Sequence, residues 1–109
     1  MENQRKIAKL IKKRVFIIPV RFVELTKNHN AALLLSQILY WSDKGRDEWF
    51  FKSYKSWEEE IFLTEYQVRN AGKILKKLEL IDTKVKLVKG ITTLHYKLDM
   101  ERLISILGG

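Results

Sequence analysis

The strongest apolar segment of the chain lies in its first half. Residues 31–43 are hydrophobic almost all round at helical spacing, which predicts a helix in the centre of a core. Either Asn28 or Asn30 can cap its first turn, because a short amide side chain can accept a hydrogen bond from a free backbone N–H. Gly45 is the predicted C-terminal stop. Before this segment, Pro19 is expected to open a brief helix.

The middle of the chain changes from strand to helical character. Asp47–Lys52 is rich in aromatic residues and predicts a strand. Ser53 or Ser56 can then cap a short helix, and Ser56 with Glu59 has capping-box spacing. The three carboxylates of Glu58–Glu60 are expected near the positive start of that helix, where negative charge is favoured.

A second helix follows after a tight connection. Thr64 and Gln67 have the spacing of a capping box, so the helix is predicted to begin just after Thr64. At about 100° per residue, its apolar positions fall on one stripe. That stripe comprises Val68, Ala71, Leu75 and Leu78.

The next segment alternates like a half-buried hairpin. A two-residue turn at Lys89-Gly90 pairs the flanking residues outward until Ile81 meets Leu98. One face then collects Ile81, Thr83, Val85, Leu87, Thr92, Leu94, Tyr96 and Leu98. The other collects Asp82, Lys84, Lys86, Thr93, His95 and Lys97. A shifted register would not sort the residues in this way, so the first face is expected to pack on the helices.

This order of elements predicts the fold class. Two helices joined by about three residues and followed at once by a hairpin match the winged helix-turn-helix plan. We expect an α+β protein with a helical core and a small antiparallel sheet of two or three strands as the wing. A last helix is predicted over 99–107. Residues 15–109 would form a winged-helix DNA-binding domain, and residues 1–14 a basic amphipathic helix with Ile7, Leu10 and Ile11 on one side.

Charge narrows the choice of partner. The 109 residues include 21 Lys and Arg against 13 Asp and Glu, a formal net charge of +8 with a pI near 9.8. Such a surplus favours nucleic acid or an anionic membrane surface as partner, although it also aids solubility. The chain has no cysteine, and its longest apolar runs are far shorter than the ~20 residues needed to span a bilayer. A cytoplasmic protein is the expectation, with membrane binding disfavoured.

The helix after Thr64 carries the candidate site for double-stranded DNA. Its polar side comprises Tyr66, Arg69, Asn70, Lys73, Lys76 and Lys77, with carboxylates only at its two ends. Arg69 can read guanine and Asn70 adenine, whereas Thr64 and Tyr66 would contact phosphate. The lysines of this helix would neutralise phosphates, and Lys86, Lys89 and Lys97 of the hairpin would reach phosphates or an adjacent minor groove. The alternatives are a merely solvated helix face and lysines that protect a strand edge.

A further set of residues resembles a known family. Tyr40-Trp41 ends an Ala-rich helix, and Trp49, Ser53 and Trp57 form a W-x-x-x-S-x-x-x-W pattern. The chain closes with Thr93, Tyr96 and Leu98. Across residues 16–103 the sequence resembles the winged-helix N-terminal domain of phage and plasmid replication initiation proteins. The resemblance implies DNA binding in replication. Such initiators usually continue into a further domain, so a fragment and a stand-alone regulator both stay open.

Other chemistries find little support in the sequence. His29 and His95 are far apart and have no carboxylate pattern around them, so no metal site is predicted. No phosphate loop or nucleophile motif is present, and we expect no catalytic residue, cofactor or small-molecule substrate. The tryptophans are expected to anchor the core. A protein–protein module of winged-helix type is the alternative function, and the N-terminal helix is the candidate element for a homodimer.

Overall fold

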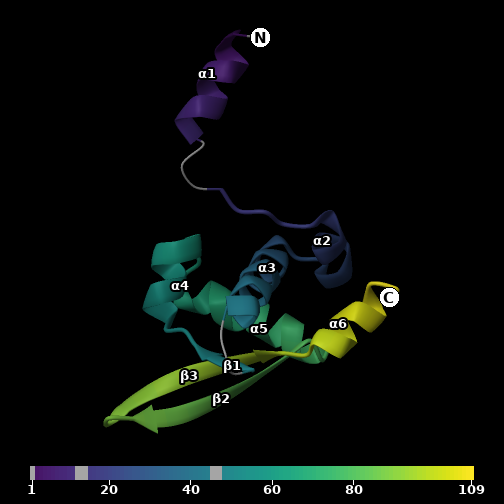
Figure 1. Cartoon of the computed structure of the whole chain (residues 1–109). Coiled ribbons are helices and arrows are strands. Elements are labelled where there is room, and N and C mark those ends of the chain that lie inside the picture. Colours follow the sequence, from purple (N-terminus) through teal and green to yellow (C-terminus); the bar gives the residue numbers. More distant parts are fainter. Residues whose placement is uncertain (1, 12–14, 45–47) are drawn as a thin grey trace.

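The computed structural model describes residues 2–11, 15–44 and 48–109. Within these ranges the chain has an α+β architecture of six helices and one three-stranded antiparallel sheet. The helices are α1 (Glu2–Ile11), α2 (Val20–Thr26), α3 (His29–Lys44), α4 (Tyr54–Ile61), α5 (Glu65–Lys77) and α6 (Met100–Ile106). The strands are β1 (Trp49–Phe51), β2 (Ile81–Val88) and β3 (Ile91–Leu98). Most of the helices lie on one side of the sheet (Figure 1).

The predicted central helix is confirmed in α3. Its side chains Ala31, Ala32, Leu34, Leu35 and Ile38 are fully buried. The helix packs against α2, α5 and β3, so it forms the middle of the core. Asn28 is the residue that caps it, since its Oδ1 accepts a hydrogen bond of 2.9 Å from the amide of Ala31. Gly45, the predicted stop, lies outside the described residues.

Helix α4 begins at Tyr54, three residues earlier than a cap at Ser56 would place its start. The hydroxyl of Ser53 accepts from the amide of Ser56, so the proposed pairing of Ser56 with Glu59 is wrong. Because the helix starts at Tyr54, Glu58–Glu60 lie in its second half and not at its positive end. The favourable interaction expected there therefore does not occur.

The actual role of one of these carboxylates is an ionic contact beside the core. Glu60 pairs with Lys52 and accepts a hydrogen bond of 2.8 Å from the indole of Trp41. The Nζ atom of Lys52 lies 4.0 Å from the centre of the Trp41 ring. These contacts tie the residue after β1 to the neighbouring helices α3 and α4.

The sheet has the order β1-β3-β2, and the hairpin register is confirmed residue by residue from Ile81 opposite Leu98 to Val88 opposite Ile91. Of the predicted strand Asp47–Lys52, Asp47 lies outside the described residues, Trp49–Phe51 form β1, which pairs with β3, and Glu48 and Lys52 lie outside the strand. Its Phe50 stacks on Tyr96 at 5.6 Å between ring centres. The indole of Trp57 donates a hydrogen bond of 3.1 Å to the Tyr96 hydroxyl, which fixes the sheet against α4.

Only the near half of the hairpin packs as predicted. Ile81, Tyr96 and Leu98 are buried against the helices. Val85 and Leu87 belong to the same face, yet they are 65% and 74% exposed. The hairpin is longer than the helical layer that covers it, so its far half projects beyond the helices (Figure 1). The expectation that the whole apolar face is covered is therefore wrong.

The tryptophans differ in their surroundings. Trp57 is fully buried, and Trp41 packs partly buried against the core. Trp49 lies on the other face of the sheet, where the Nζ atom of Lys84 sits 4.0 Å from the centre of its ring. The prediction of core anchors is therefore confirmed for Trp57 and is wrong for Trp49.

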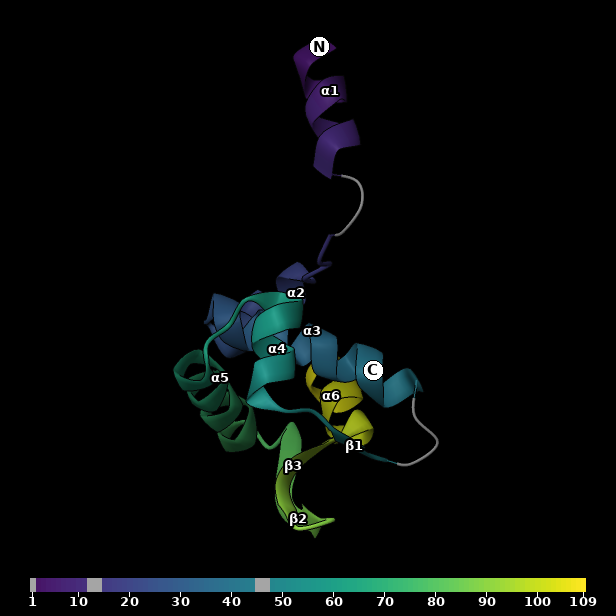
Figure 2. The same cartoon turned by 90° about the vertical axis from the view of Figure 1, so that its left-hand side faces the viewer.

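Helix α1 stands apart from the rest of the molecule in both views (Figures 1 and 2). None of its residues is buried, and Ile7, Leu10 and Ile11 are all exposed. The sequence predicted this apolar stripe, but the structure provides no surface that covers it. Among the helices described, none has the length and apolar character that crossing a membrane requires.

Candidate nucleic-acid interface

Helix α5 positions most of the predicted site residues. It begins after Thr64, whose hydroxyl accepts from the amide of Gln67, while the Gln67 side chain accepts from the amide of Thr64 at 2.9 Å. The predicted capping box is therefore confirmed. Because the Thr64 oxygen serves as acceptor in this cap, its own O–H proton remains available to a phosphate.

The polar side of α5 is open to solvent along its length. Its apolar residues Val68, Ala71 and Leu75 are buried against the core. The opposite side presents exposed side chains, which we call the basic face of α5: Tyr66, Arg69, Asn70, Lys73, Lys76 and Lys77. All six residues predicted for this helix thus share one accessible face.

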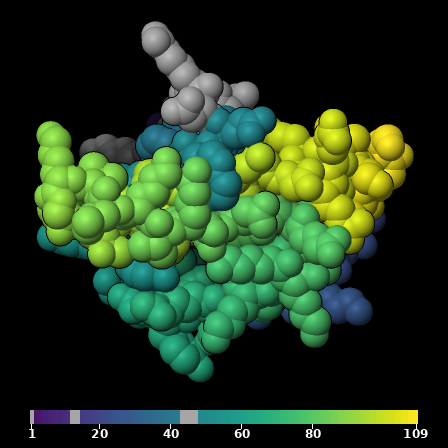
Figure 3. Space-filling model, turned by 90° about the horizontal axis from the view of Figure 1, so that it is seen from below, coloured from purple at the N-terminus to yellow at the C-terminus, as the bar shows by residue number. Residues whose placement is uncertain are grey.

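The hairpin lies beside α5 on the same side of the molecule (Figure 3). Arg69, Lys73 and Lys76 line a groove of about 210 Å³ whose other wall includes Thr83 and Leu94 of the hairpin. Backbone hydrogen bonds hold the two parts together, since the amide of Leu80 bonds to Leu75 and the amide of Asp99 bonds to Leu80. The helix and the hairpin therefore present one continuous surface.

Arg69 is held by two neighbours within this surface. Its Nη2 and Nε atoms lie 3.0 and 3.1 Å from a carboxylate oxygen of Glu65, one turn earlier. Its guanidinium carbon sits 5.2 Å from the centre of the Tyr54 ring. Glu65 thus compensates the charge of Arg69, although the sequence placed it only at the margin. Both side chains are more than half exposed, so the ion pair is weak. Another anion can therefore replace Glu65 as the partner of Arg69.

The three predicted lysines of the hairpin have unlike surroundings. Lys86 and Lys89 are exposed near its free end. Lys97 lies at the opposite end, where its Nζ is 3.0 Å from a carboxylate oxygen of Glu48. The hydrogen bond with Glu48 and the charges around it raise the pKa of Lys97. Lys86 and Lys89 are therefore better placed than Lys97 to meet a polyanion.

Two contributors to this surface were not among the predicted site residues. Tyr54 supports the guanidinium of Arg69, and nothing in its local pattern distinguished it from a core aromatic. Lys84 extends the row of hairpin lysines and lies over the Trp49 ring. Partial burial, together with the charges of Lys86 and Lys84, lowers the pKa of His95. Burial is the larger cause, and the positive charge at this part of the hairpin acts in the same direction.

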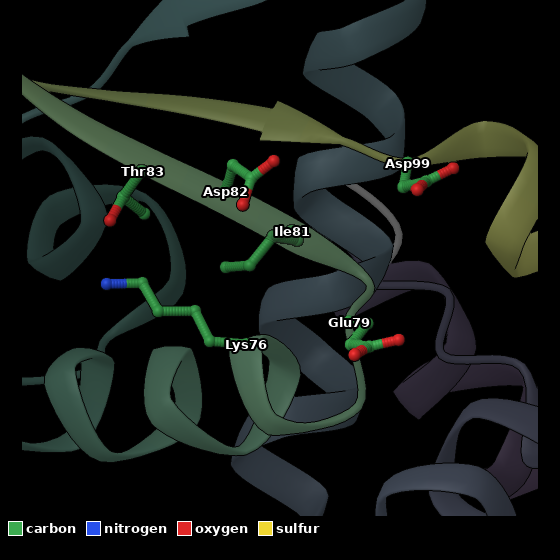
Figure 4. A pocket seen from close by; sticks show the side chains of 6 residues that line it. All are labelled: Lys76, Glu79, Ile81, Asp82, Thr83 and Asp99. Carbon is green, nitrogen blue, oxygen red and sulfur yellow. The ribbon is translucent and has the colours of Figure 1, made fainter.

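Carboxylates mark the end of the positive surface. A pocket of about 460 Å³ lies where α5 meets the base of β2, and it is lined by Lys76, Glu79, Asp82 and Asp99 among others. Lys76 reaches from α5 towards Thr83, while the three carboxylates are spread around the rim (Figure 4). In the parts of the chain that the structure covers, no cluster of His, Asp or Glu residues is arranged to hold a metal ion. A polyanion would therefore be favoured nearer the start of α5 and the free end of the hairpin.

No protein-family model, no curated protein and no solved structure matches this chain.

Proposed function

We propose that this protein binds double-stranded DNA as a winged helix-turn-helix protein. Helices α4 and α5 are joined by only three residues, Phe62 to Thr64, and the hairpin β2–β3 follows α5 directly. In such a plan the second helix enters the major groove and the hairpin serves as the wing. The basic face of α5, exposed beside the hairpin lysines on one side of the molecule, is the observation that carries the proposal.

Each predicted residue has a role in this arrangement. Arg69 and Asn70 lie in the first half of α5, the part that meets base edges, and both types can form two hydrogen bonds with one base. On binding DNA, Arg69 would release its ion pair with Glu65 and form hydrogen bonds with guanine. Thr64 and Tyr66 would contact phosphate at the helix start. The lysines of the two elements, Lys73, Lys76, Lys77, Lys86, Lys89 and Lys97, would contribute affinity without reading sequence.

The setting proposed for this binding is replication initiation or transcription regulation in a phage, virus or plasmid. It rests on the resemblance of Tyr40-Trp41, of the Trp49, Ser53 and Trp57 pattern, and of the chain around Tyr96 to replication initiators. Most of those positions belong to the core or to caps. They support the fold of the family more directly than they support its function in replication.

The test is the affinity for labelled duplex DNA across a series of salt concentrations, measured by fluorescence anisotropy. We expect log K to fall with log salt at a slope of about −4 to −7, equivalent to roughly five to eight neutralised phosphates. Lys73→Ala should reduce the steepness of that slope by about one. Arg69→Ala with Lys73→Ala should weaken binding further, because it also leaves Glu65 unpaired against the phosphates.

Arg21→Ala is the matched control, because Arg21 is an exposed cation on α2, on the side of the molecule away from the sheet. It should leave the slope and the affinity nearly unchanged. Absence of duplex binding at low salt would overturn the proposal. If Lys73→Ala and Arg21→Ala reduced the affinity for DNA equally, the protein would be attracted to DNA by its net charge alone. The basic face of α5 would then have no specific role. The protein–protein module would then be the better hypothesis.

A further inference from the structure

The free end of the hairpin exposes apolar side chains on both of its faces. Val85 and Leu87 are 65% and 74% exposed on one face, and Val88 and Ile91 are 44% and 67% exposed on the other. The near half of the same hairpin buries its apolar residues against the helices. Clustered exposed aliphatic residues on a protein surface usually mark a place of interaction.

The charges around these residues indicate the chemistry of the partner. From Thr83 to Leu98 the hairpin contains four lysines, one histidine and no carboxylate. Two copies of such a surface would repel each other, which disfavours a contact between two hairpins. A nucleic acid suits it better, since phosphates lie along its surface and apolar base faces lie within.

The position of the hairpin beside α5 favours DNA over an anionic membrane. The basic face of α5 lies on the same side of the molecule and exposes no aliphatic stripe that a bilayer would take up. With α5 in the major groove, the hairpin beside it faces the adjacent minor groove. A two-stranded ribbon fits a major groove of about 12 Å but not a minor groove of about 6 Å. Insertion of the hairpin therefore requires the minor groove to widen.

We propose that the free end of the hairpin, residues 85–92, is a wedge that bends the bound duplex by inserting Leu87, the most exposed of its aliphatic side chains, at a base step. Apolar side chains that enter a minor groove separate stacked bases and kink the duplex towards the major groove. Lys86 and Lys89 would hold the phosphates on either side of the insertion. This inference rests on the proposed duplex binding and adds a deformation of the DNA to it.

The test uses the whole chain and a random-sequence duplex with a donor and an acceptor dye at its ends. Binding of the wild type should raise energy transfer between the dyes, and permanganate should oxidise thymines that become unstacked. Leu87→Thr with Ile91→Thr removes the apolar surface but keeps residues that favour strands. We expect this variant to lose at least about half of the change in energy transfer while its affinity falls less than about threefold.

Val15→Thr with Ile17→Thr is the matched control, since both residues are exposed aliphatic side chains in the segment before α2, which forms neither helix nor strand. It should bend DNA like the wild type. Circular dichroism verifies that each variant is folded, which the exposure of all four positions favours. A second hairpin variant, Leu87→Lys, should also reduce bending while binding the duplex at least as tightly, because it adds a charge.

The outcomes separate this inference from the proposed function. Duplex binding with the expected salt slope but without any change in energy transfer would overturn the wedge and leave DNA binding intact. Equal bending by wild type and hairpin variant would overturn it too. If the wild type binds no duplex, both proposals fail. Hairpin-dependent binding to phosphatidylserine vesicles, or hairpin-dependent self-association in sedimentation, without bending of DNA would assign these residues to a membrane or to a second copy.

Discussion

At the scale of single residues, the Tyr96 hydroxyl connects the sheet to the helices. It accepts the indole N–H of Trp57, and both side chains are buried. Burial raises the pKa of Tyr96 to about 12, and the hydrogen bond from Trp57 opposes this rise only in part. The phenol therefore stays neutral at physiological pH and remains an acceptor for the indole.

Tyr96→Phe should lower the free energy of unfolding by about 1–3 kcal/mol, because the buried N–H of Trp57 would lose its acceptor. Urea denaturation followed by circular dichroism measures the change. Tyr66→Phe is the control, since the Tyr66 side chain is 74% exposed, and it should leave stability unaltered. A Tyr96→Phe protein as stable as the wild type would mean that water satisfies the indole, and the hydrogen bond would then contribute little.

At the scale of elements, the start of α5 depends on one side chain that caps it. Thr64→Ala removes the acceptor for the Gln67 amide and should cost about 1 kcal/mol of stability. Thr64→Ser keeps the hydroxyl and should restore most of that loss. Thermal denaturation compares the three proteins. If Ser and Ala variants melted at the same temperature, packing of the threonine methyl group would be the source of the effect and the cap would not.

The local features of these elements were predictable from the sequence. The capping box of Thr64 and Gln67 depends on a spacing of three residues, and the hairpin register depends on alternation around the Lys89-Gly90 turn. Both are set by neighbours along the chain. The choice of Ser53 over Ser56 as cap was not predictable, because it depends on where β1 ends against β3.

Features that depend on the extent of packing could not be inferred in this way. Alternation assigns Val85 and Leu87 to one face of the hairpin, but it does not indicate whether a helix covers that face. The same limit applies to the candidate site. Periodicity placed Arg69 on the polar side of α5, yet its contact with Tyr54 joins two helices and follows only from the tertiary arrangement.

At the scale of the whole molecule, α1 is a separate addition to the folded part. Since none of its residues is buried, deletion of residues 2–14 should change the free energy of unfolding by less than about 0.5 kcal/mol. Urea denaturation of the two chains gives the comparison. Phe22→Ala is the positive control: this core residue is 3% exposed, and its truncation should cost about 3–5 kcal/mol. A loss of similar size on deletion would show that α1 docks onto the protein in solution.

The strand order β1-β3-β2 also bears on how the chain folds. Two residues connect β2 to β3, whereas Trp49 must find Lys97 across nearly half of the chain. The entropy lost on closing a loop increases with its length, so β1 is the more costly strand to place. It is also held by only three residue pairs. We therefore expect the hairpin to form early and β1 to join it last, an order that pulsed hydrogen exchange would reveal strand by strand.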